Sequence, residues 1–191
     1  MRKIFAIAIG SLSLLGYTAR TGSAERAAET LTLTTTSKIW VDGTSNVKAF
    51  SCTATKIDAN IDAQPNTNPA TAVKSASLVI PVNALDCRNE TMNEHMKKAL
   101  KMGNNPQIKW RMTSYAVEGS SVVMKGFLTI AGKENPIELQ GTGSSENGVL
   151  KVKGSKQFKM SEYGVKPPTM MFGTMRVNDL VKVGFDIALQ Q

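Results

Sequence analysis

The chain is poor in the side chains from which catalytic and metal sites are most often built. Among 191 residues it has one histidine, His95, and two cysteines, Cys52 and Cys87. It has no second histidine and no C-x-x-C pair to complete a zinc site, and no G-x-S-x-G or P-loop motif. A surface or helix-flank position is the simpler interpretation of His95. The pattern therefore favours a protein without catalysis, metal or cofactor; an isomerase or hydrolase that relies on His95 is the alternative.

Long hydrophobic runs are absent except at the N-terminus. Residues 4–17 are mostly apolar and follow Arg2 and Lys3, while Gly22 and Ala24 are small residues at the −3 and −1 positions of a cleavage site. This pattern predicts a signal peptide over residues 1–24 and export to a periplasm or beyond the cell. The run is shorter than the about 20 residues of a membrane-spanning helix, so we expect no stable membrane insertion. An uncleaved anchor helix is the alternative.

Acidic residues are the minority, and the chain has a net charge of +8. Removal of residues 1–24 would leave 20 basic and 15 acidic side chains, a net charge of +5. The lysines are scattered along predicted strands and do not cluster with aromatic residues, which is typical of a solvated surface. We therefore expect no nucleic-acid partner, whereas a homodimer stays open.

The two cysteines have a simple interpretation in an exported chain. Two cysteines in an oxidising compartment predict one disulfide, Cys52–Cys87. It would close a loop of about 36 residues and stabilise the fold by about 4 kcal/mol in the loop-entropy description. Two reduced, buried thiols are the alternative.

From Lys38 onward, apolar and polar residues alternate with the period of a β-strand. One-sided alternation of this kind is typical of antiparallel sheets with one solvated face. Residues 25–36 show no clear period and are predicted to be a flexible lead-in to one domain over residues 37–191. The predicted strands cover residues 38–43, 47–62, 73–82, 107–115, 121–132, 133–143, 149–160 and 180–189.

One short helix is predicted between these strands, after residue 90. Thr91 and Glu94 have the spacing of a capping box, and Gly103 is a natural residue to follow the C-terminus. One face of this helix is apolar, formed by Met92, Met96, Ala99 and Leu100. Many evenly spaced strands with one helix predict an eight-stranded antiparallel β-barrel whose mouth the helix partly covers.

Several stretches resemble the YceI-like family of periplasmic, lipocalin-like barrel proteins. The resemblance is carried by "IWVDGTSNVKAFSC", "SLVIPVNALDCRNETMNEHMKKAL", "NPQIKW", "MKGFLTIAGKENPIELQGTG" and "FKMSEYGV", and it runs from about Ser37 to Leu189. It implies an all-β, eight-stranded antiparallel barrel that encloses a polyisoprenoid or quinone-like chain. It implies no catalytic residues and offers no ligand-binding motif to carry over.

The leading hypothesis is an exported protein that sequesters or carries a long-chain amphiphile in an apolar barrel. The nine methionines after residue 24 together suit an adaptable binding surface, although filling a core is the better interpretation of any single one. A non-enzymatic interaction or scaffold protein with a filled barrel is therefore the alternative. Strand alternation and the apolar loop at residues 167–175 predict the lining residues Phe50, Leu78, Ile80, Met96, Leu100, Trp110, Met112, Met124, Leu128, Phe172 and Phe185.

Overall fold

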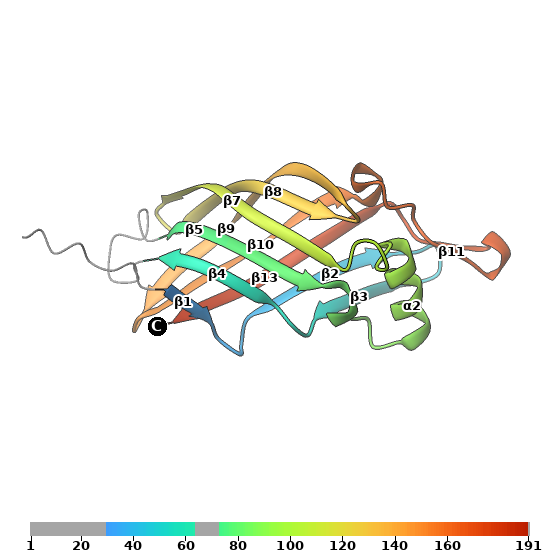
Figure 1. Cartoon of the computed structure of the whole chain (residues 1–191), viewed down its shortest axis with the longest axis horizontal. Coiled ribbons are helices and arrows are strands. Elements are labelled where there is room, and N and C mark those ends of the chain that lie inside the picture. Colours follow the sequence, from blue (N-terminus) through green and yellow to red (C-terminus); the bar gives the residue numbers. More distant parts are fainter. Residues whose placement is uncertain (1–29, 64–72, 191) are drawn as a thin grey trace, which may run out of the picture.

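The computed structural model describes residues 30–63 and 73–190 (Figure 1). The predicted signal peptide, residues 1–24, lies outside the described residues. Eleven strands form one antiparallel sheet: β1 (Thr30–Leu33), β2 (Lys38–Thr44), β3 (Ala49–Ala54), β4 (Asp58–Ala63), β5 (Val73–Pro81), β6 (Leu85–Asp86), β7 (Gln107–Glu118), β8 (Ser121–Ile130), β9 (Lys133–Glu146), β10 (Val149–Lys159) and β13 (Leu180–Gln190).

The sheet closes into a barrel with eight positions around its ring. β1 pairs with the C-terminal end of β13, and β2 pairs with the N-terminal half of β13. β1 and β2 therefore occupy one position of the ring together. β3 and β4 share the next position, because β3 pairs with β2 and β4 pairs with β1. β5 and β6 share the third. This confirms the predicted eight-stranded antiparallel barrel.

Two of the predicted segments are divided differently in the structure. The flexible lead-in over 25–36 is wrong for Thr30–Leu33, because β1 pairs with both β4 and β13 and buries Leu31 to 2 % exposure. The predicted strand over 47–62 is two strands that separate at residues 55–57. At this break the backbone N–H of Thr55 donates to the carbonyl of Ala84 over 2.8 Å.

Tight two-residue turns join the strands of two hairpins. Ala131 and Gly132 both have positive φ between β8 and β9, as do Asn147 and Gly148 between β9 and β10. Two successive residues with positive φ match the right-handed twist of the flanking strands in a two-residue hairpin loop. These turns fix the registers Ile130–Lys133 and Glu146–Val149.

A β-bulge in β7 changes which side chains face the barrel interior. The register with β8 shifts between Met112 and Ser114. Before the shift Ile108, Trp110 and Met112 face inward, and after it Tyr115 and Val117 do. One extra residue reverses the period-2 alternation, so both halves of this long strand present apolar side chains to the same interior.

The helix α2 (Glu90–Ala99) lies at one end of the barrel, the same end as the short hairpin of β11 (Thr169–Met170) and β12 (Met175–Arg176) (Figure 1). The predicted caps are wrong by two residues at each end. Asn89 is the N-cap, and its side-chain oxygen accepts a hydrogen bond from the Met92 N–H. Lys101, not Gly103, has the left-handed conformation after the helix.

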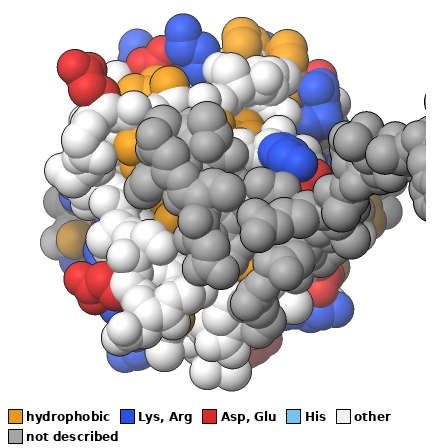
Figure 2. All heavy atoms as spheres, turned by 90° about the vertical axis from the view of Figure 1, so that its left-hand side faces the viewer, with side chains coloured by type: hydrophobic (Ala, Val, Ile, Leu, Met, Phe, Trp, Pro, Cys, Tyr) orange, Lys and Arg blue, Asp and Glu red, His pale blue; other side chains and the backbone are white. Residues whose placement is uncertain are grey.

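The opposite end of the barrel is seen in Figure 2. On that face, basic and acidic side chains are interspersed around the rim, together with small hydrophobic patches. Within residues 30–63 and 73–190, no helix is long and apolar enough to cross a bilayer.

Candidate functional site

A cavity of about 520 Å³ lies inside the barrel. It extends from Leu150 and Leu189, near one end of the barrel, to Val177 and Pro168, which belong to the segment containing the β11–β12 hairpin. A volume of this size is within the usual range of small-molecule sites, which are concave and mostly apolar. The filled barrel of the alternative hypothesis is therefore not what the structure shows.

Two clusters of buried side chains form the cavity walls. One contains the lining residues Ile39, Ile61, Leu150, Phe185 and Ile187, among others. The second, toward α2 and the 3-10 helix η2 (Met160–Tyr163), consists of Ile130, Phe158, Tyr163, Val165 and Val181. The half-buried residues Leu100, Ile108 and Val183 contact both clusters, so the apolar lining is continuous along the barrel.

Ten of the eleven predicted lining residues surround this cavity. Phe50 comes from β3, Leu78 and Ile80 from β5, Met124 and Leu128 from β8, and Phe185 from β13. Trp110 and Met112 come from β7, Met96 comes from α2, and Leu100 is the C-cap residue that directly follows this helix. The Trp110 side chain is 8 % exposed, and its indole nitrogen lies close to Gly126 of the neighbouring strand, where a Cβ would come within 3.1 Å of it.

The prediction for Phe172 is wrong. This residue is fully exposed, with 111 % of its reference surface accessible, and it is not part of the cavity lining. It lies in the turn between β11 and β12 with φ of 54° and ψ of 30°. The residue that follows, Gly173, also has positive φ, and this tight turn places the phenyl ring away from the barrel interior.

Few polar groups reach the cavity. His95 and Trp110 belong to the lining, and each has a buried ring nitrogen, Nδ1 and Nε1, that has no hydrogen-bond partner among the described residues. Lys48, an exposed residue of the β2–β3 turn, lies at the end near α2, so the cavity reaches the surface there. Lys156 of β10 lines the wall. A ligand with one polar group and a long apolar part would match this distribution.

Two tyrosines of the lining are held in the neutral state. Tyr163 is 3 % exposed and packs edge-to-face on Phe158, with ring centroids 5.2 Å apart. Its burial raises the pKa of its hydroxyl to about 12, and the nearby negative charge of Glu162 adds to the effect. Burial also raises the pKa of Tyr115. Both side chains therefore contribute uncharged, largely apolar surface at neutral pH.

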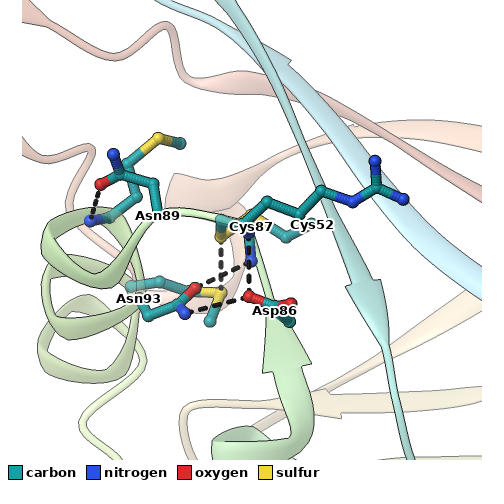
Figure 3. The surroundings of a disulfide bond; sticks show 8 residues. Cys52, Asp86, Cys87, Asn89 and Asn93 are labelled. Atoms are coloured by element: carbon teal, nitrogen blue, oxygen red, sulfur yellow. Dashed lines mark hydrogen bonds between the residues drawn. A yellow bond between two sulfur atoms is a disulfide. The ribbon is translucent and has the colours of Figure 1, made fainter.

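The start of α2 is attached to the barrel wall by a disulfide and a group of hydrogen bonds (Figure 3). Cys87 is bonded to Cys52 of β3, as predicted. Asn93 Nδ2 donates to Asp86 Oδ1 over 3.1 Å, and Asn93 Oδ1 accepts from the Cys87 N–H over 2.8 Å. The hydrogen bond from Asn93, followed by that from the Arg88 N–H, lowers the pKa of Asp86. The helix is thereby fixed over the end of the cavity.

Sequence reasoning did not single out Lys156 or the two unpartnered ring nitrogens. The alternation of β10, in which Leu150, Val152 and Phe158 face inward, places Lys156 on the same inward face. The sequence therefore contained the information that predicts an inward position for Lys156. The environment of the two ring nitrogens could not be predicted in this way, because it depends on which strands pack together.

Within the described residues, no group of three or more histidine, cysteine or acidic side chains could hold a metal ion.

Comparison with known proteins identifies relatives of this chain. The model of the YceI-like domain matches residues 25–189. BcnA of Burkholderia cenocepacia has a similar structure, with 23 % identity, a TM-score of 0.67, and coverage of 80 % of this chain and 95 % of BcnA. No curated protein sequence matches this chain significantly.

Two further solved structures share the fold. A polyisoprenoid-binding domain from Saccharophagus degradans, implicated in plant cell wall breakdown, has 15 % identity, a TM-score of 0.64, and coverage of 85 % of this chain and 98 % of that domain. The YCEI protein of Campylobacter jejuni has 18 % identity, a TM-score of 0.60, and coverage of 72 % and 82 %.

Proposed function

Because this chain belongs to the YceI-like family, we propose that it is an exported, non-enzymatic protein that binds a polyisoprenoid, a quinone-like lipid or another long-chain amphiphile. The observation that carries this proposal is the continuous apolar cavity of about 520 Å³. The polyisoprenoid-binding domain of similar fold from Saccharophagus degradans adds support. The Cys52–Cys87 disulfide supports export, because such bonds persist in oxidising compartments.

The mechanism is burial of the tail. Each methylene transferred from water into the cavity contributes about 0.8 kcal/mol, and the half-buried methionines of the lining, such as Met96, Met112 and Met124, adapt to the shape of the chain. The end near α2 is the proposed entry, since exposed Lys48 belongs to the lining there. There a lysine or a tyrosine can contact the head group.

A catalytic role for His95 has little structural support. Its Nδ1 is buried without a hydrogen-bond partner in the described part of the chain. A histidine that acts as a general base is usually oriented by a hydrogen bond from one ring nitrogen to a carboxylate or carbonyl. We therefore assign His95 to the cavity wall.

Mass spectrometry under native conditions tests the proposal. The protein is purified without detergent, and its mass is compared before and after organic extraction, with the extract analysed for lipids. The expected result is an adduct with the mass of a long-chain amphiphile, or one that reappears when farnesol or a quinone with an isoprenoid tail is added. A protein that carries no lipid and takes up neither compound would contradict the proposal.

A further inference from the structure

Lys156 occupies an inward-facing position in an otherwise apolar strand face. Leu150, Val152 and Phe158, at the same phase of β10, are buried, whereas Lys156 is half-buried and lines the cavity. Its partner across the ladder with β13 is Val183, which contacts both apolar clusters. Removing an ammonium group from water is unfavourable unless it is paired, so this position requires an explanation.

The ladder of paired strands that forms the barrel wall is interrupted at this place. The ladder between β9 and β10 ends at the pair Gly141–Gly154. Beyond that pair, β9 still pairs with β8 back to Lys133, and β10 still pairs with β13 as far as Lys159. Residues 133–140 and 155–159 therefore face each other without register pairs. Lys156 lies at this separation of β9 and β10, which we call the β9–β10 gap.

The charges around the gap leave one positive charge uncompensated. Glu138 lies on the outer face of β9, between the cavity-lining Ile137 and Leu139, and its carboxylate is 3.7 Å from the Lys125 ammonium. The hydrogen bond from Gln140 lowers the pKa of Glu138, and the positive charges of Lys125 and Lys156 lower it further. The single carboxylate of Glu138 thus interacts with the positive charges of two lysines, and its ion pair is with Lys125. Among the described residues, Lys156 itself has no ion pair.

The lining as a whole favours a negative ligand group over a positive one. Among the described residues that line the cavity, the charged ones are Lys48 and Lys156, and none is aspartate or glutamate. Because Lys156 is long, its stem can stay against the apolar wall while its ammonium reaches into the β9–β10 gap, as lysines do at apolar boundaries. An anionic oxygen of a ligand at the gap would accept a charge-assisted hydrogen bond from this ammonium.

We propose that Lys156 binds the anionic head group of the amphiphile, a phosphate or a carboxylate, at the β9–β10 gap. This inference rests on the proposed function, because the apolar cavity supplies the site for the tail. A neutral amphiphile of equal chain length binds in the same cavity without this interaction. A cationic amphiphile meets two lysines and, within the described part of the lining, no acidic side chain.

Farnesyl phosphate and farnesol, which have the same tail, separate the two contributions. Their affinities are measured by isothermal titration calorimetry for the wild type and for Lys156→Met, which retains an unbranched apolar stem. We expect the wild type to prefer the phosphate, and Lys156→Met to reduce this preference about tenfold, equivalent to about 1.4 kcal/mol, with farnesol affinity unchanged. Lys156→Arg, which keeps the charge, should retain the preference.

The matched control is Lys151→Met, which removes an exposed lysine from the outer face of the same strand. It should leave the preference unchanged. Inorganic phosphate alone should not displace farnesyl phosphate at equal concentration. Equal preference in the wild type and Lys156→Met, or equal loss in Lys151→Met, would overturn the role of Lys156. Displacement by inorganic phosphate would overturn the assignment of an amphiphile to this site, because it would show that the tail adds no affinity. If the wild type binds neither farnesyl compound nor a longer isoprenoid, the proposed function itself fails, and this inference with it.

Discussion

Cys52 and Cys87 are joined by a disulfide that links β3 to the segment directly before α2 (Figure 3). Both residues also line the cavity, and Met96 Sδ of the helix lies 3.8 Å from Cys87 Sγ. The disulfide thus joins the barrel wall and the covering helix at one point. Met96 of this helix also lines the cavity. Because the disulfide holds the start of the helix on the barrel wall, it also helps to fix the position of Met96 at this end of the cavity.

The first prediction concerns this disulfide. Replacing both cysteines, Cys52→Ser with Cys87→Ser, should lower the free energy of unfolding by about 4 kcal/mol, since the bond restrains a long loop in the unfolded chain. Urea unfolding with and without reductant measures the effect. Reduced wild type should unfold near the midpoint of the variant, and an unchanged midpoint in both would show that the bond contributes no stability.

The second prediction distinguishes the observed N-cap from the one that the sequence suggested. Asn89 accepts a hydrogen bond from the Met92 N–H over 2.9 Å, so Asn89→Ala should destabilise the helix by about 1 kcal/mol. Thr91→Ala, at the position of the predicted capping box, should destabilise the helix clearly less than Asn89→Ala. Hydrogen exchange of the α2 amides in both variants measures the difference. A larger loss of protection in Thr91→Ala would contradict the assignment of Asn89.

The barrel could be predicted because most of its strands show uninterrupted alternation. In β13, Val181, Val183, Phe185, Ile187 and Leu189 all face inward, as the sequence indicates. The turns at Gly132 and at Asn147–Gly148 have residues suited to positive φ. Local chemistry thus determines these elements, and closure of the sheet follows from the need to bury one face of every strand.

Where the prediction was wrong, partners distant in the sequence decide the structure. In β3 the buried side chains have even residue numbers, such as Cys52, whereas in β4 they have odd numbers, such as Ile61. This change in the alternation marks the break between the two strands. β1 has only four residues, too few to establish a period, and it is ordered by pairing with β4 and β13. Phe172 was placed by the composition of its loop, which carries no information on the direction of the turn.

The third prediction tests whether the cavity is the binding site. Met124→Trp should fill part of the cavity and reduce binding of farnesol at least severalfold, because the half-buried Met124 side chain lines the wall. Phe172→Trp, which introduces the same side chain at a fully exposed position, should leave the affinity unchanged. Calorimetric titration of both variants measures this. Comparable losses in the two variants would place the ligand outside the barrel.

The fourth prediction uses the buried hydroxyl of Tyr163. The pKa of this group is raised to about 12 in the folded protein by burial, with Glu162 contributing, from its ordinary value of 10.0. Between these two pH values the unfolded chain loses this proton while the folded protein keeps it. Stability that is fully present below pH 10 is therefore lost as the pH rises toward 12.

Tyr163→Phe removes this titration and keeps the edge-to-face contact with Phe158. The free energy of unfolding, measured by urea titration from pH 9 to pH 12, should fall less steeply with pH in the variant than in the wild type. Tyr115→Phe is the comparison, because Tyr115 is only half-buried and its pKa is raised by burial alone. Its effect on the slope should be smaller. Parallel slopes in wild type and Tyr163→Phe would mean that the Tyr163 hydroxyl reaches water in the folded state.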